Sequence, residues 1–193
     1  SCVPGLSPVT FSERAAQAIK GRGHRAQSWF LDLELVMGYW GEGAQRAYHH
    51  TAPVNALYGL HEALVILEEE GLENSWARHR RNHEALAAGL EALNIEFVVD
   101  AEHRLPQLNC VSFPAGVDDA AVRRQLLADF QLEIGAGLGP LAGKVWRIGL
   151  MGYASNQKNV LLCLGALEAV LAQQGIPVDA GEAIAAAQAV YAS

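Results

Sequence analysis

Apolar residues recur at helical spacing through the first half of the chain. A short helical stretch begins at Ser12, whose side chain is typical of an N-cap, and ends near Gly21. A second amphipathic stretch spans residues 28–39. Proline is tolerated in the first turn of a helix and glycine commonly ends one, so we expect a longer helix between Pro53 and Gly71. Its single apolar stripe consists of Val54, Leu57, Leu60, Leu64 and Leu67.

The period changes from helix to strand after residue 94. A long helix is expected at 73–93, and helical patterns return later at 117–130, 155–174 and 179–193. Short apolar runs rich in branched and aromatic residues lie at 95–99, 108–113, 132–134 and 145–150. This interleaving predicts an α/β layer in which helices cover one face of a small sheet. We interpret the helices before residue 94 as a connection to a larger structure.

The composition is that of a globular protein with an acidic balance. Of 193 residues, 51% are hydrophobic and 18% are charged, which suffices for one domain or for two subdomains. The formal net charge of -7 argues against nucleic acid as a partner, because that binding depends on clustered Lys and Arg. One basic cluster, Arg78, Arg80 and Arg81, is short, and we interpret it as a solvated helix face.

The cysteines and the first residues of the chain bear on the cellular location of the protein. Cys2, Cys110 and Cys163 are odd in number and widely spaced, so they fit no disulfide framework and favour a reducing, cytoplasmic location. No apolar run reaches the ~20 residues that a membrane span needs, so we expect no membrane partner. The chain opens in a Pro/Gly stretch without an initiator Met or a signal-peptide pattern, and we interpret it as a fragment.

Two patterns that could indicate a ligand site are weak. His79 and His83 have the i, i+4 spacing of metal ligands, but no Glu lies in the catalytic position between them and no third ligand is indicated, so we predict no metal site. The glycine-rich segment 135–144 suggests a phosphate-binding loop, but Leu138 stands where that motif requires Gly, and Val145 replaces its Ser or Thr. A flexible turn that leads into the next strand is the simpler interpretation.

Arg147 is a more specific candidate because it lies inside an apolar strand pattern. A cation in such a place needs a partner that offsets its loss of solvation. The pattern leaves two alternatives open, a structural carboxylate and a ligand.

Tyr48 and Thr51 lie where a loop meets the predicted helix at Pro53, in the string Tyr48-His49-His50-Thr51. Thr51 could cap that helix, and Tyr48 could be a packed aromatic whose hydroxyl is hydrogen-bonded. The residues alone favour these structural roles.

Four strings in register carry a family resemblance. They are YHHTAP at 48–53, ENSWARHR at 73–80, RLP at 104–106 and GLGPLAGKVWRIGL at 137–150. In order and spacing, from Pro4 to about residue 171, they resemble the alanine-glyoxylate (serine-pyruvate) aminotransferases, which are class-V-type pyridoxal-phosphate enzymes. The resemblance covers only the C-terminal half of that family's chains.

The resemblance implies the C-terminal part of a fold-type-I pyridoxal-phosphate transferase, which is α/β and homodimeric. Residues 1–72 would supply the end of the large cofactor-binding domain and a connecting helix, and residues 73–193 the small C-terminal domain. The lysine that binds pyridoxal phosphate would fall just upstream of Ser1, so this chain itself would carry no catalytic residue. The missing N-terminal half and a second copy of the chain are the implied partners.

Three residues match functional positions of the family. Tyr48 and Thr51 match residues that reach across the dimer to the phosphate of the neighbouring subunit's cofactor. Arg147 matches the arginine that binds the substrate carboxylate, a pairing for which the planar guanidinium is suited.

The resemblance implies transfer of an amino group from a small amino acid, alanine or serine, to a 2-oxo acid such as glyoxylate or pyruvate. The alternatives are a ureidoglycine-type transaminase, a lyase or desulfurase of the same fold type, and a non-catalytic dimerisation module.

Overall fold

The computed structural model describes residues 2–39 and 48–193, which divide into two compact units at residues 65 and 66. The division falls within helix α3 (Val54–Glu70). It lies before the boundary after residue 72 that the sequence predicts, and the assignment of the two parts to a large and a small domain stays a prediction. Each unit is described below by itself.

The first unit contains two short helices. Helix α1 (Glu13–Lys20) begins where Ser12 Oγ accepts a hydrogen bond from the backbone of Ala15, which confirms the predicted N-cap. Helix α2 (Leu33–Met37) is much shorter than the predicted stretch 28–39. The reason is local: the side chain of Asp32 accepts from the backbone of Glu34 and starts the helix there.

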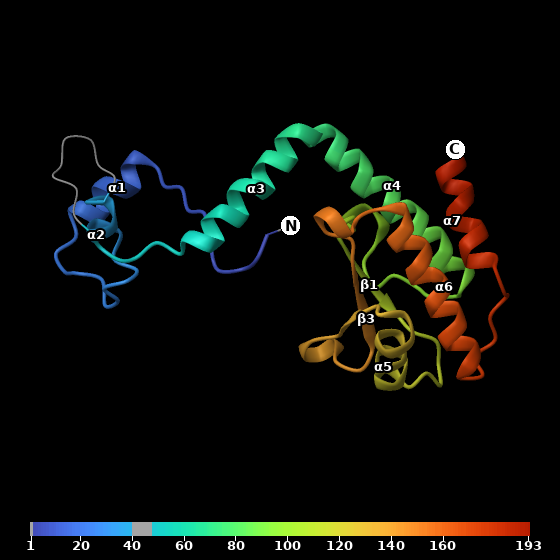
Figure 1. Ribbon diagram of the computed structural model, residues 1–193. Helices are drawn as coiled ribbons and strands as arrows, with labels where there is room; N and C mark the ends of the chain where they lie inside the picture. The colour runs from blue at the N-terminus through green and yellow to red at the C-terminus, as the bar shows by residue number, and fades with distance from the viewer. Residues whose placement is uncertain (1, 40–47) are drawn as a thin grey trace. The chain divides into compact units, whose positions relative to one another are not determined.

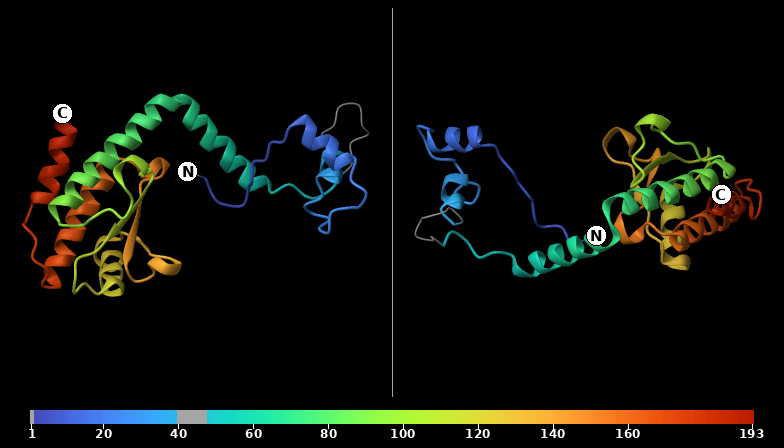
Figure 2. Two further views of the ribbon diagram at one scale, coloured as in Figure 1. Left: turned by 180° about the vertical axis from the view of Figure 1, so that it is seen from behind. Right: turned by 90° about the horizontal axis from the view of Figure 1, so that it is seen from above.

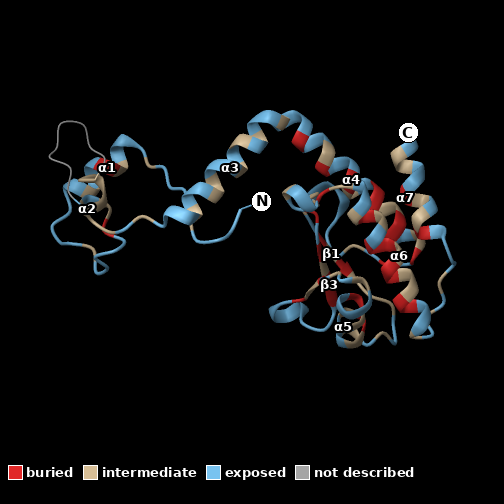
Figure 3. Ribbon diagram, viewed as in Figure 1, coloured by how far each residue is buried: buried red, intermediate tan, exposed pale blue. Residues whose placement is uncertain are grey.

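Helix α3 follows the prediction closely and ends before Gly71, which adopts a positive φ of 82°. The structure describes all of its residues, and none of them is buried. Val54, Leu57 and Leu64 of its apolar stripe are exposed, as the pale blue of α3 shows (Figure 3).

The second unit is built around three long helices. Helix α4 (Leu72–Ala92), α6 (Gln157–Gln173) and α7 (Glu182–Ala192) lie against one another (Figures 1 and 2). They approach closely at Gly89 of α4, where an added Cβ would lie 2.8 Å from the backbone oxygen of Ala183 on α7. Glycine is therefore needed at this position, because the helices leave no space for a side chain.

A three-stranded antiparallel sheet lies under these helices. Its order is β1 (Leu108–Ser112), β3 (Val145–Gly149), β2 (Gly135–Ala136), and helix α5 (Asp119–Phe130) separates β1 from β2 in the chain. The predicted small sheet with helices on one face is confirmed. The predicted strand at 95–99 is shortened to a bridge from Phe97 to Val111, with backbone hydrogen bonds from Val98 to Cys110 and from Ser112 to Glu96. The predicted strand at 132–134 is wrong, because this segment precedes β2 without pairing.

The two faces of the sheet differ in burial because side chains alternate along each strand. The face toward the helices carries Asn109, Val111, Trp146 and Ile148, all of them buried. The opposite face, which we call the open face, carries Leu108, Cys110, Ser112, Arg147 and Gly149, none of them buried, and is closed at one end by buried Val145. Among the described residues, no helix is both long enough and apolar enough to cross a membrane.

Candidate functional site

Arg147 lies at the centre of the open face. Its neighbours in register are Cys110 on β1 and Gly135 on β2. The Nε–H of Arg147 donates to the backbone oxygen of Ala136 at 2.7 Å. No Asp or Glu that the structure describes forms an ion pair with Arg147, and its Nη atoms donate no hydrogen bond to a described residue. Of the two alternatives that the sequence left open, this geometry favours a ligand over a structural carboxylate.

The arginines that do have structural partners show the contrast. Arg123 and Asp119 form an ion pair on α5 at 2.8 Å, and Asp119 Oδ1 also accepts from the indole N–H of buried Trp146 at 2.8 Å. The bond from Arg123 is the main reason why the pKa of Asp119 lies below its ordinary value, and the bond from Trp146 acts in the same direction.

Arg78 also has a full set of partners, which corrects its interpretation as part of a solvated face. It forms an ion pair with Glu70, and its Nη1 donates to the backbone oxygens of Gly152 at 2.8 Å and Ser155 at 2.7 Å. The hydrogen bond from Arg78 lowers the pKa of Glu70, whose side chain is half-buried. Arg80, in contrast, is exposed as predicted. The sequence signal for Arg78 was absent, because most of its partners lie about 75 residues away.

The histidines of α4 are structural. His79 is buried, its Nδ1–H donates to the oxygen of Ser75 at 2.7 Å, and its Nε2 accepts from the backbone of Gly152 at 3.0 Å. His83 donates from Nδ1 to Oδ1 of buried Asn109 at 2.6 Å. These bonds occupy both ring nitrogens of His79, and no group of three possible metal ligands occurs among the described residues. Asn109 could have been flagged from the sequence, because an amide inside an apolar strand needs partners.

Tyr48 and Thr51 lie in the first unit, where their hydroxyl groups are hydrogen-bonded to each other. The side chain of Tyr48 is 70% exposed, so it is not the packed aromatic that its residue type suggested. Thr51 is not adjacent to the helix, which begins at Val54, and its hydroxyl contacts Tyr48 instead of serving as a cap. The two hydroxyls together form an exposed polar pair.

The two histidines between Tyr48 and Thr51 belong to a cluster of aromatic rings. His49 stacks on Trp29 with ring centroids 4.1 Å apart, and its Nδ1 is hydrogen-bonded to Nδ1 of His50 at 2.8 Å. His50 also contacts the ring of Phe30 at 4.9 Å. The Nε2 of His49 is buried and has no hydrogen-bond partner among the described residues.

The glycine-rich segment 135–144 forms a turn between strands, as the simpler interpretation had it. After β2 the chain makes a short 3-10 turn at Gly139–Leu141 and enters β3 at Val145. Gly137 is closely surrounded, because an added Cβ would lie 2.6 Å from the carbonyl carbon of Leu141. This segment places β2 beside Arg147.

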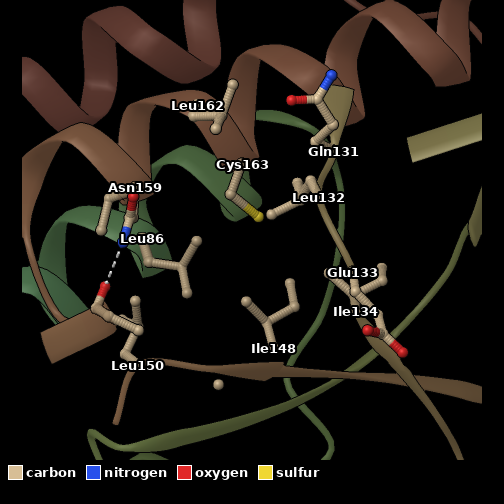
Figure 4. A pocket seen from close by; sticks show the side chains of 13 residues that line it. Leu86, Gln131, Leu132, Glu133, Ile134, Ile148, Leu150, Asn159, Leu162 and Cys163 are labelled. Carbon is tan, nitrogen blue, oxygen red and sulfur yellow. Dashed lines mark hydrogen bonds between the residues drawn. The ribbon is translucent and has the colours of Figure 1, made fainter. Parts of the chain in front are cut away.

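A cavity of about 240 Å³ lies on the other side of the sheet, toward the helices. Its walls include Leu86 of α4, Ile148 of β3 and Cys163 of α6, with Leu132 opposite the sulfur (Figure 4). Burial raises the pKa of the Cys163 thiol to about 12. A thiol in this state is a poor nucleophile near neutral pH, so the cavity offers no reactive group comparable to Arg147.

The chain is similar to known proteins over most of its length. Residues 15–160 match the family described as aminotransferase class-V. The curated (S)-ureidoglycine–glyoxylate transaminase of Bacillus subtilis is 40% identical over 97% of this chain and 49% of its own length. The alanine–glyoxylate aminotransferase of Callithrix jacchus is 43% identical over 87% of this chain and 41% of its own length.

The comparison of structures also finds an aminotransferase. The crystal structure of the ureidoglycine-glyoxylate aminotransferase from Bacillus subtilis superposes with a TM-score of 0.90 at 42% identity, over 95% of this chain and 47% of that chain. The predicted fold class is therefore confirmed as the α/β fold of aminotransferases. The chain belongs to the class-V aminotransferase family, and it spans about half the length of the curated relatives that it matches.

Proposed function

We propose that this chain is part of a pyridoxal-phosphate-dependent aminotransferase that moves an amino group from a small amino acid to a 2-oxo acid such as glyoxylate. Arg147 binds the α-carboxylate of both substrates. The observation that carries the proposal is the state of Arg147 on the open face: a half-buried guanidinium with one backbone acceptor and no carboxylate partner among the described residues. A substrate carboxylate supplies the counter-charge that the fold does not.

The residues near Tyr48 fit the phosphate of the proposed cofactor. Two exposed hydroxyl groups, those of Tyr48 and Thr51, lie within hydrogen-bond reach of each other and can both donate to one anion. We propose that they bind the phosphate of the cofactor in a neighbouring subunit, which makes the protein a homodimer. The cytoplasmic location stays a prediction.

The chemistry divides between the cofactor and this chain. When bound, pyridoxal phosphate supplies the carbonyl carbon that accepts the amino group and the ring that stabilises negative charge at the substrate α-carbon. Arg147 holds the substrate carboxylate so that the α-hydrogen points in a fixed direction, which is a positioning contribution. Tyr48 and Thr51 hold the far end of the cofactor, and the backbone oxygen of Ala136 on β2 keeps the guanidinium of Arg147 in place.

Two kinds of amino donor are candidates for this chain. Relatives are named for alanine and for ureidoglycine as donors, and both names include glyoxylate as the acceptor. Alanine or serine is our first proposal, and ureidoglycine is the second, because a relative named for it matches 97% of the chain. Turnover with each donor at a fixed glyoxylate concentration distinguishes them. A lyase or desulfurase would release product without any 2-oxo acid acceptor, and a non-catalytic module would bind no pyridoxal phosphate.

The variant Arg147→Lys tests the carboxylate-binding role. Lysine keeps the charge but loses the planar fork that contacts both carboxylate oxygens. In the holoenzyme we expect kcat/KM for alanine to fall about 10-fold or more, which corresponds to at least ~1.4 kcal/mol of transition-state stabilisation. An alkylamine without a carboxylate should lose far less, because it never makes this contact.

Arg124→Lys is the matched control, since Arg124 is an exposed arginine on α5. It should leave turnover and thermal stability unchanged. A structural role for Arg147 predicts a different pattern, with a lower melting temperature and equal losses for amines and amino acids. Undiminished alanine turnover in Arg147→Lys would exclude Arg147 as the carboxylate-binding residue.

A further inference from the structure

The guanidinium of Arg147 is held on the side of β2 and not on the side of β1. Gly135 of β2 is its partner in register, and the next residue, Ala136, accepts the hydrogen bond from Nε at 2.7 Å. β2 has only two residues, so this contact forms at a short edge strand. The backbone of β2 thus sets the direction in which the guanidinium lies.

Gly135 leaves room for this arrangement. An added Cβ would lie 3.2 Å from Nη2 of Arg147 and 3.4 Å from its Cζ. These contacts are tight, so a side chain at position 135 would displace the guanidinium, by a few tenths of an ångström for alanine and by more for a larger residue. Gly135 has no positive φ, so the backbone itself would accept another residue. What matters at position 135 is the missing side chain.

The hydrogen bond from Nε also decides how a carboxylate can bind. A guanidinium can hold a carboxylate through two Nη atoms or through Nε and one Nη. Because Nε is already bonded to Ala136, only the edge formed by Nη1 and Nη2 remains for two parallel bonds. Cys110 is the neighbour of Arg147 on β1, so it lies on the side of β3 that faces away from β2.

We propose that Gly135 is a positioning residue for substrate binding: the absence of its side chain lets the guanidinium lie across β2, bonded to Ala136, and fixes an end-on contact between its Nη atoms and the substrate carboxylate. This inference rests on the proposed role of Arg147. It adds that the identity of residue 135, acting through the guanidinium of Arg147, sets the affinity for α-carboxylates.

The experiment is a graded series at position 135 in the holoenzyme. Gly135→Ala displaces the guanidinium by a few tenths of an ångström and Gly135→Val by more, and misplacement of about 1 Å can cost two orders of magnitude in rate. We expect the dissociation constant of 2-methylalanine, which has a carboxylate but no α-hydrogen, to rise about 3-fold for Ala and about 10-fold or more for Val. Calorimetry measures this constant without turnover.

Three further readouts separate positioning from damage to the fold. Gly149→Ala and Gly149→Val are the matched controls, because Gly149 lies on the same face of β3 and an added Cβ there would meet nothing within 4 Å. Turnover of an alkylamine and the content of bound cofactor should change less than 2-fold in the Gly135 series. If Gly135→Val fails to fold, Gly135→Ala decides the matter.

A double-mutant cycle with Arg147→Lys tests whether the effect passes through the guanidinium. The loss caused by Gly135→Ala should largely disappear in the Arg147→Lys background, since a lysine does not form the same contacts. Equal loss in both backgrounds, or unchanged affinity in Gly135→Ala and Gly135→Val, overturns the positioning role while leaving Arg147 as the carboxylate ligand. Undiminished alanine turnover in Arg147→Lys alone overturns the proposed carboxylate-binding role of Arg147, on which this inference rests.

Discussion

Gly89→Ala is the sharpest test of how the helices of the second unit pack. Position 89 lies on α4 where α6 and α7 approach it. An added Cβ would clash with one methyl group of Leu164, lie 2.6 Å from the other, and lie 2.8 Å from the backbone oxygen of Ala183. Leu164 is fully buried, so its side chain has little space to move, and the oxygen of Ala183 can move only if α7 does.

Two opposing effects set the magnitude. Alanine is a better helix former than glycine by about 1 kcal/mol, which favours the variant. Extra volume in a packed core costs about 1–3 kcal/mol. The contacts at Gly89 involve a backbone atom as well as a side chain, so we take the upper part of that range. We therefore expect the variant to lower the free energy of unfolding by about 1–2 kcal/mol.

Denaturant unfolding followed by circular dichroism measures this change. Gly165→Ala on α6 is the control, because its added Cβ would meet only the end of the Ile184 side chain, at 3.2 Å. That variant should be neutral or more stable by up to about 1 kcal/mol. If Gly89→Ala is as stable as Gly165→Ala, the close approach of α4 and α7 is not a feature of the folded protein.

Two other perturbations follow from the contacts. Tyr48→Phe and Thr51→Val should each weaken pyridoxal-phosphate retention about 10-fold or more, since each removes a hydrogen bond to a charged group worth roughly 1.5–3 kcal/mol. The measurement is cofactor affinity, with Tyr58→Phe, at an exposed tyrosine of α3, as the control. Unchanged affinity would return Tyr48 and Thr51 to structural roles. At alkaline pH, the buried Cys163 thiol keeps its proton up to a pKa of about 12, while the unfolded chain releases it near the ordinary ~8.5. The folded state is therefore disfavoured as pH rises, and the stability advantage over Cys163→Ala should shrink by about 1.4 kcal/mol per pH unit above roughly pH 9. A constant difference between the two proteins across that range contradicts the buried, protonated state.

The helices were largely predictable because their signals are local. Ser12, Pro53 and Gly71 mark helix ends through their own side chains or backbone preferences, and the structure places the ends of α1 and α3 at or next to these residues. The stretch 28–39 shows the limit of apolar periodicity. Its aromatic residues Trp29 and Phe30 stay outside α2, where they contact the rings of His49 and His50 instead.

The strands were less predictable because pairing depends on a distant partner. The runs 95–99 and 132–134 have the composition of strands, yet the first pairs with β1 only around Phe97 and the second does not pair. The paired residues of β2 are Gly135 and Ala136, which have low strand propensity by themselves. They pair because the turn at 139–141 returns the chain alongside β3.

Arg78 and Arg147 show why a sequence pattern alone could not tell which arginine has structural partners. Arg78 lies in a basic, polar helix and was expected in solvent, yet Glu70 and two backbone oxygens accept hydrogen bonds from its guanidinium. Arg147 lies in an apolar strand and was expected to need a partner, either a structural carboxylate or a ligand, and among the described residues the fold provides only the oxygen of Ala136. The local surroundings therefore gave the wrong expectation for Arg78 and left Arg147 undecided. The two arginines differ in the number of acceptors that the tertiary structure brings to each guanidinium, and the arginine with fewer acceptors is the one for which we propose a substrate carboxylate.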